Sequence, residues 1–241
     1  MKRNFLFISC IILIASLSSC KKDDKKTDTY KCTTCKTTPD ALVANDAGSK
    51  GVYKGIVIGS TGTISFNIMN GGSTITATMV LDGTTVNLTS NVLWSAVNAY
   101  VAPFTGILNG TPISITFSVD ANGRNPIVMS SNIPGHTTAQ FNLLKETSSA
   151  LLECFEGTYE TTKPETGTFN MLISRALGKM GGSSRKTSGT SNGNFEGTVD
   201  ANGNVKNTDG LLMGKIIADE ISGSFKDSNG RTVTIKAKRT L

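Results

Sequence analysis

Short segments of this chain alternate between apolar and polar residues, which is the pattern of half-buried β-strands. Residues 63–68 and 74–80 alternate in this way, and residues 104–108 and 113–119 form a further pair on either side of Asn109-Gly110. Asn-Gly and Asp-Gly steps between such segments favour tight hairpin turns, because both positions tolerate a positive φ. The pattern therefore predicts antiparallel β-hairpins over most of the chain.

Three segments depart from this alternation. Over residues 138–154 the apolar residues have a helical spacing, so that one face carries Phe141, Leu144, Leu151, Leu152 and Phe155. We predict an α-helix there, and a short helical turn over residues 40–47. Residues 176–194 are rich in Gly, Ser and Thr, and we expect them to form a mobile loop.

The second half of the chain resembles the first. Residues 62–68 (GTISFNI) match residues 167–173 (GTFNMLI), and the sequence Val-Asp-Ala-Asn-Gly occurs at both 119–123 and 199–203. Gly51-Val52-Tyr53 likewise compares with Gly-Thr-Tyr at residues 157–159. We interpret these matches as a degenerate duplication.

The expected fold is therefore an all-β domain over residues 39–241, an antiparallel meander barrel or sandwich. It would be built from two similar halves, at about 50–130 and 155–241, joined by the α-helix at about 138–154. The halves could close into one barrel or stack as two sheets. The sequence leaves both arrangements open.

Composition narrows the classes of partner. Only 6% of the residues are aromatic and 17% are charged, and the formal net charge is +6. No basic stripe interleaved with aromatic residues is present, as a nucleic-acid-binding surface would require. We expect no nucleic-acid partner.

The N-terminus has the organisation of an export signal. Lys2 and Arg3 precede an apolar stretch from Phe5 to Leu17, which is too short to span a bilayer comfortably. The stretch ends in Leu17-Ser18-Ser19-Cys20. We predict that residues 1–19 are a signal peptide.

Leu17-Ser18-Ser19-Cys20 resembles the lipobox of bacterial lipoproteins. The resemblance implies cleavage before Cys20, acylation of that cysteine and attachment to a membrane through the lipid. The following charged run, residues 20–26 (CKKDDKK), is similar to the surface-export signal of Bacteroidota lipoproteins. This resemblance implies attachment to the outer membrane and favours its outer face. We expect residues 20–38, which are polar and Thr-rich, to be a flexible tether.

Cys32-Thr33-Thr34-Cys35 is the clearest chemical motif. In an exported protein this spacing serves as a redox pair, as half of a zinc site or as a structural disulfide. A redox role needs a helix N-terminus at the first thiol, and zinc needs four ligands. We favour a local Cys32–Cys35 disulfide, with pairing of either residue to Cys154 as the alternative. Cys154 has apolar neighbours in the sequence, and we interpret it as a small, buried apolar residue.

The other candidates for catalysis or metal binding lack the further residues that such sites need. His136 has no Gly-x-Ser-x-Gly nucleophile motif with it, so a hydrolase triad is not supported. Asp120, Asp200 and Asp227 each begin an Asp-x-Asn-Gly sequence, but the further carboxylates of a calcium loop are missing. We interpret these three as hairpin turns, and we predict no metal site and no cofactor.

Two further sets bear on function. Glu153, Glu156 and Glu160 could supply a carboxylate pair for glycoside hydrolysis, although exposed charge is the preferred interpretation. Trp94 and Tyr100 could form the rim of a ligand site, or simply belong to the core.

With no catalytic set recognised, we do not expect an enzyme. The favoured function is a β-rich binding or interaction domain on a lipid tether. One alternative is a lipocalin-like carrier of a small apolar ligand, although Tyr53 and Tyr159 stand where such barrels usually have Gly-x-Trp. The other is an enzyme that acts on surface glycans.

Overall fold

The computed structural model of this chain describes residues 29–241, which form β-strands with one short 3₁₀ turn. The predicted signal peptide, Cys20 and the first part of the predicted tether lie outside the described residues. The elements are η1 (Val43–Asn45), β1 (Gly51–Ile58), β2 (Gly62–Ile68), β3 (Ile75–Leu81), β4 (Thr84–Thr89), β5 (Tyr100–Leu108), β6 (Thr111–Val119), β7 (Ile127–Asn132), β8 (Gln140–Glu146), β9 (Glu153–Thr161), β10 (Thr166–Ser174), β11 (Lys179–Lys186), β12 (Asn192–Val199), β13 (Asn204–Asn207), β14 (Leu212–Ile217), β15 (Glu220–Lys226) and β16 (Thr232–Arg239).

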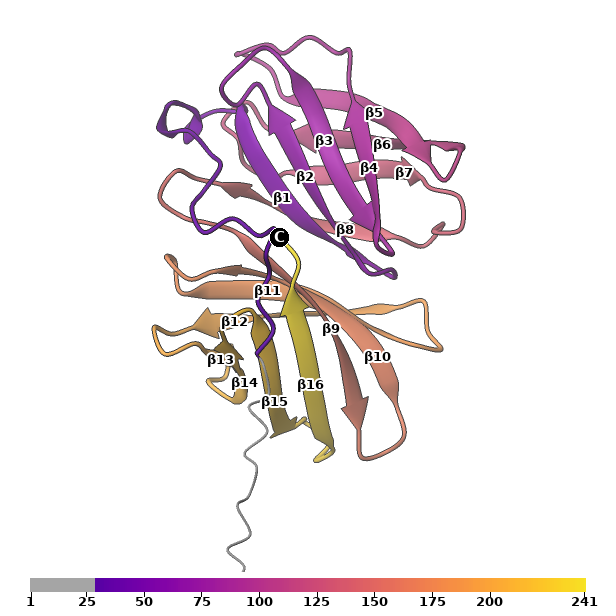
Figure 1. The fold of residues 1–241 in the computed structure, drawn as a ribbon, viewed down its shortest axis with the longest axis vertical. Helices are drawn as coiled ribbons and strands as arrows, with labels where there is room; N and C mark the ends of the chain where they lie inside the picture. The colour runs from indigo at the N-terminus through magenta and orange to yellow at the C-terminus, as the bar shows by residue number, and fades with distance from the viewer. Residues whose placement is uncertain (1–28) are drawn as a thin grey trace, which may run out of the picture.

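The strands form two antiparallel units, one above the other in Figure 1. The N-terminal unit is an eight-stranded sheet in the order β7-β6-β5-β4-β3-β2-β1-β8. The C-terminal unit is a closed barrel in which β16 returns to pair with β9. The all-β prediction is confirmed, and each half of the chain forms its own eight-stranded unit.

The two units share a topology. In each, the first strand pairs with both the second and the eighth strand, and the intervening strands follow in chain order. The N-terminal unit differs because no ladder joins β7 to β8, so its ring stays open at that seam. The register also differs: Tyr53 pairs with Phe66, whereas Tyr159 pairs with Gly167.

The predicted α-helix at 138–154 is wrong. Residues 140–146 are β8, and β9 begins at Glu153 after a tight connection. These strands lie between the two units, so both of their faces can bury apolar side chains. Leu143 enters the N-terminal core, Cys154 packs between the units and Phe155 points into the barrel. A strand buried on both faces loses its period of two and resembles a helix in sequence.

The predicted loop at 176–194 is also wrong, because most of it forms β11 and the start of β12. Its small residues are needed where strands and units approach closely. Ser183 and Arg185 are buried, and the Asn142 side chain donates a hydrogen bond of 2.9 Å to the Ser183 hydroxyl. The predicted helical turn at 40–47 is reduced to the 3₁₀ turn η1.

The units are joined by a small apolar cluster and by buried polar contacts. Ile56, Ile58, Cys154 and Leu172 form the cluster, against which the C-terminal Leu241 packs. Figure 1 shows the C-terminus at this junction. Within residues 29–241, no helix has the length and apolar character needed to cross a bilayer.

Candidate functional site

The interior of the N-terminal unit is filled by aromatic side chains. The Phe66 and Phe117 rings stack with their centroids 4.4 Å apart. Tyr53 lies 5.2 Å from Phe117, and Phe104 meets Phe66 edge-on at 5.0 Å. All four are almost fully buried and pack closely against one another in this core.

The C-terminal barrel is packed at one end and open at the other. Near the N-terminal unit, Phe155, Ile173, Val205 and Ile221 are buried in the barrel core. Toward the opposite end several inward side chains are only half-buried, and a cavity of about 340 Å³ lies among them. Its apolar lining consists of Tyr159, Phe169, Met171, Phe195, Met213, Phe225, Val233 and Ile235. The β9–β10 and β15–β16 turns, at the lower edge of Figure 1, mark the open end.

Inward-facing glycines keep this end open. Gly182 pairs directly with Phe195, and a β-carbon added at Gly182 would lie 2.7 Å from that ring. Gly157 stands in the same relation to Phe169, at 2.7 Å. A ring that lies over a glycine on the neighbouring strand stays against the wall, so the lumen is not filled.

A set of charged side chains stands at the mouth of the cavity. The Arg231 Nε donates a hydrogen bond of 2.6 Å to Asp227, and its Nη1 lies 3.3 Å from Glu165. Lys186 Nζ is 3.4 Å from the same Glu165 carboxylate, and the Tyr159 hydroxyl donates to it at 3.2 Å. We call Glu165, Lys186, Asp227 and Arg231 the rim charges.

Both rim carboxylates are held in their ionised form. Partial desolvation favours protonation of Glu165, but Lys186, Tyr159 and Arg231 outweigh it and lower the pKa of that carboxyl. Desolvation also opposes ionisation of Asp227, yet hydrogen bonds from the Arg231 side chain and from turn N–H groups lower its pKa. At neutral pH two positive and two negative charges therefore face one another at the mouth.

The predicted ligand-rim residues lie far from this cavity, in the N-terminal unit. Tyr100 is buried, and its hydroxyl donates a hydrogen bond of 3.1 Å to the Val92 carbonyl. Trp94 is half-buried against the aromatic core, with its indole N–H 2.9 Å from the Ser49 hydroxyl and the Lys50 ammonium 4.2 Å from its ring. Both residues serve the packing of the N-terminal unit.

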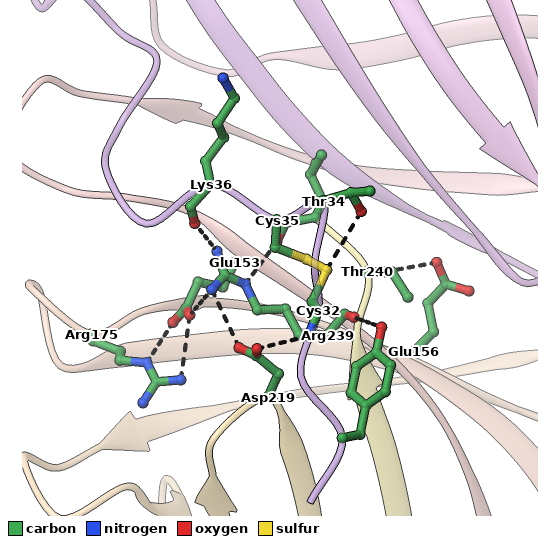
Figure 2. The surroundings of a disulfide bond; sticks show 12 residues. Cys32, Thr34, Cys35, Lys36, Glu153, Glu156, Arg175, Asp219, Arg239 and Thr240 are labelled. Atoms are coloured by element: carbon green, nitrogen blue, oxygen red, sulfur yellow. Dashed lines mark hydrogen bonds and ion pairs between the residues drawn. A yellow bond between two sulfur atoms is a disulfide. The ribbon is translucent and has the colours of Figure 1, made fainter.

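Cys32 and Cys35 form a local disulfide within a segment, residues 30–36, that is hydrogen-bonded to the barrel. The Cys32 N–H donates to Asp219 at 2.9 Å, and the Tyr30 hydroxyl donates to the Arg239 carbonyl at 3.0 Å. Figure 2 shows the Arg239 guanidinium between Asp219 and Glu153, beside the disulfide. This part of the predicted tether lies against β16.

The three glutamates considered for glycoside hydrolysis do not form a facing pair. Glu153 is buried and bound by Arg239 at 3.0 Å and by Arg175 at 2.6 Å. Glu156 accepts a hydrogen bond of 2.9 Å from Thr240, and burial raises its pKa. Glu160 is exposed four residues further along β9, about 13 Å away at strand spacing. That separation exceeds the distance used by either hydrolytic mechanism.

The Asp-x-Asn-Gly sequences form turns. One Asp200 carboxylate oxygen accepts from the N–H groups of Asn202 and Asn204, and Asp227 does the same for its own turn. His136 Nε2 lies 3.5 Å from Asp82 beside a surface turn. Within the part of the chain that the structure describes, no three His, Cys, Asp or Glu side chains gather as a metal cluster.

Cys154 is fully buried between the units, with its sulfur 3.7 Å from the Gly55 carbonyl oxygen. Desolvation is the main reason why the pKa of its thiol is raised. A buried thiol of this kind is chemically inert.

Comparison of the chain with protein-family models, with curated proteins and with solved structures finds no match. The site is therefore defined by its geometry alone. Sequence reasoning missed the cavity residues, because Phe195, Met213 and Phe225 look like ordinary core positions. The available signal is the pairing of inward glycines with aromatic residues, which only the strand register reveals.

Proposed function

We propose that this chain is a lipid-anchored protein of the bacterial envelope whose C-terminal barrel carries a small apolar ligand. The observation that carries this proposal is the open apolar cavity of about 340 Å³. Its volume lies within the range of small-molecule sites, and eight-stranded barrels have an interior that either fills with side chains or holds one small ligand.

The contrast between the two units supports this function. The N-terminal unit has a stacked aromatic core, whereas the C-terminal barrel leaves Tyr159, Phe195 and Phe225 half-buried on its inner wall. Covering apolar surface of this kind contributes about 25 cal/mol for each Å² removed from water. A ligand in the barrel would complete the burial that the core of the other unit achieves with its own rings.

The test is displacement of an uncharged fluorescent probe, N-phenyl-1-naphthylamine, from the purified protein. Val233→Trp adds bulk at the cavity wall, and Val101→Trp places the same side chain on the exposed outer surface of β5 as a matched control. We expect saturable binding by the wild type and by the control, with a loss of at least tenfold in affinity for Val233→Trp. Absence of saturable binding by the wild type, or equal affinity of both variants, would overturn the carrier function.

The anchor is tested separately. Lipoprotein processing predicts that radiolabelled palmitate enters the wild-type protein through Cys20 and that the protein fractionates with membranes. Cys20→Ser is expected to abolish both. Unchanged labelling and fractionation of the Cys20→Ser protein would exclude this mode of attachment, whatever the barrel binds.

A further inference from the structure

The rim charges restrict which apolar molecules the cavity accepts. Arg231 and Lys186 balance Glu165 and Asp227, so these four charges sum to zero. These groups are paired with one another at 2.6–3.4 Å rather than directed apart. Any charged group placed among them would meet a like charge as close as its counter-charge.

An anionic head is opposed by the Glu165 carboxylate. The lowered pKa of Glu165 keeps that group ionised at neutral pH, and it lies beside both rim cations. A carboxylate that approached Lys186 or Arg231 would therefore stand within a few ångströms of Glu165. At that distance the two like charges repel each other.

A cationic head group is disfavoured as well, because both rim carboxylates already have partners. Asp227 is engaged by the Arg231 Nε and by two N–H groups of its own turn, and Glu165 is engaged by Tyr159 and by both cations. An ammonium group would have to displace a cation that is already in place. Each carboxylate thus already makes three hydrogen-bond or ion-pair contacts.

A neutral acceptor is the head that the mouth can satisfy. Within residues 29–241, Arg231 uses Nε and Nη1 in side-chain contacts and leaves Nη2 without a partner. The Tyr159 hydroxyl, which donates to Glu165, keeps its lone pairs free to accept. A carbonyl or hydroxyl at the mouth could thus take a hydrogen bond from Arg231 while its apolar chain contacts Phe225 and Val233 further in.

We infer that the cavity selects an uncharged single-chain amphiphile, with an ester, amide or alcohol head at the rim and its chain in the barrel. This rests on the proposed carrier function and adds the chemical class of the ligand. The selection follows from charge balance at the mouth, since the apolar wall alone would not distinguish heads.

Three probes with one chain length test this inference: decanamide, decanoate and decylamine, each used to displace N-phenyl-1-naphthylamine at pH 7. For the wild type we expect decanamide to displace the dye at least tenfold more effectively than decanoate or decylamine. Glu165→Gln gives the mouth a net positive charge and should shift the preference toward decanoate. Arg231→Gln gives a net negative charge and should shift it toward decylamine.

Glu160→Gln is the matched charge control, because Glu160 is exposed on the same strand as Tyr159 and does not line the cavity. It should keep the wild-type order of the three probes. Equal or better binding of decanoate or decylamine by the wild type would overturn the inference and leave the carrier function standing. If the order of the three probes is unchanged in both rim variants, the inference is likewise overturned and the carrier function stands. If the wild type binds neither the dye nor any probe, the carrier function itself fails.

Discussion

The Phe195 ring lies over Gly182 on the inner wall of the C-terminal barrel, and the two residues face each other across the β11–β12 ladder. A β-carbon at Gly182 would come within 2.7 Å of the ring and would also meet the Asn170 carbonyl oxygen. The space beside the Phe195 ring thus depends on the absence of a β-carbon at residue 182.

Gly182→Ala should therefore push the Phe195 ring toward the lumen. We expect a loss of about 1–3 kcal/mol in the free energy of unfolding, as for overpacked sites, together with weaker dye binding. Gly181→Ala is the control, because a β-carbon there would have its nearest neighbour at 3.8 Å. Chemical denaturation and dye titration of both variants check this. Equal behaviour of the two would show that the ring does not depend on Gly182.

The two aromatic sets should differ in their contribution to stability. Phe117→Ala removes a fully buried ring from the core of the N-terminal unit and should cost about 3–5 kcal/mol. Phe225→Ala removes a half-buried ring from the cavity wall and should cost clearly less, because its site already borders open space. Urea denaturation of both proteins measures the difference. Comparable losses would mean that the barrel interior is as tightly packed as the other unit.

Lys54 and Glu146 form a buried ion pair at 2.7 Å, with Asp40 3.2 Å from the same ammonium group. Lys54→Met leaves the Glu146 charge buried without its partner and should cost about 3–5 kcal/mol in the free energy of unfolding. Lys206→Met is the control, since the Lys206 side chain is 41% exposed and its ion pair with Asp200 at 4.0 Å should be worth no more than about 1 kcal/mol. The prediction fails if denaturation midpoints of the two variants coincide.

The disulfide should keep residues 32–35 in the conformation that contacts the barrel. Replacing both Cys32 and Cys35 by serine removes a very short loop closure, so the global loss should be small, roughly 1–2 kcal/mol. Local protection should change more. We expect faster amide hydrogen exchange at position 32, whose N–H donates to Asp219 in the wild type, with exchange in the N-terminal unit as the internal reference. Unchanged exchange at that N–H would indicate that Arg239 and Asp219 hold the segment unaided.

Asp200 should make stability depend on pH in acid. Hydrogen bonds from the Asn204 side chain and from turn N–H groups lower the pKa of this carboxyl in the folded state. The stabilisation is therefore present above the ordinary aspartate pKa of about 3.9 and is lost as the pH falls through the lower folded value. The difference in unfolding free energy between wild type and Asp200→Asn should be largest near pH 7 and should shrink below about pH 4.

Asp120→Asn is the control for this experiment, because it lies in the same Val-Asp-Ala-Asn-Gly sequence but its carboxylate is bound by the Asn125 side chain. A pH dependence as large as that of Asp200→Asn would show that the turn N–H groups are not responsible.

The sequence predicts the fold class and the repeat because both depend on alternation and turn residues. Ile64, Phe66 and Ile68 point into one core just as their period of two indicates. The prediction from sequence fails at β8 and β9, because Leu143 and Cys154 pack into different clusters and the alternation is lost. It also fails at β11, since glycine and serine have weak strand preferences and are selected there by the rings and strands that cover them.

The candidate site was harder to foresee than the fold. Trp94 and Tyr100 are aromatic and close in sequence, which suggests a ligand rim, but both pack in the N-terminal unit. The cavity instead combines residues from all eight strands of the barrel and from their turns. Only the register, which pairs Phe195 with Gly182, shows that aromatic side chains leave space there.

Residues 29–36 lie along the outside of the barrel, next to β16. Lys36 contacts Arg239 near the end of β16, Tyr30 contacts the same residue, and Thr29 has reached the neighbourhood of Lys236. The chain, read backwards, thus runs toward the end where the cavity opens, and Figure 1 shows it descending beside β15 and β16. The ten residues from Tyr30 back to Cys20 reach at most about 35 Å. With Cys20 acylated as proposed, Tyr30 and the barrel strand that it contacts would be held within this distance of the bilayer.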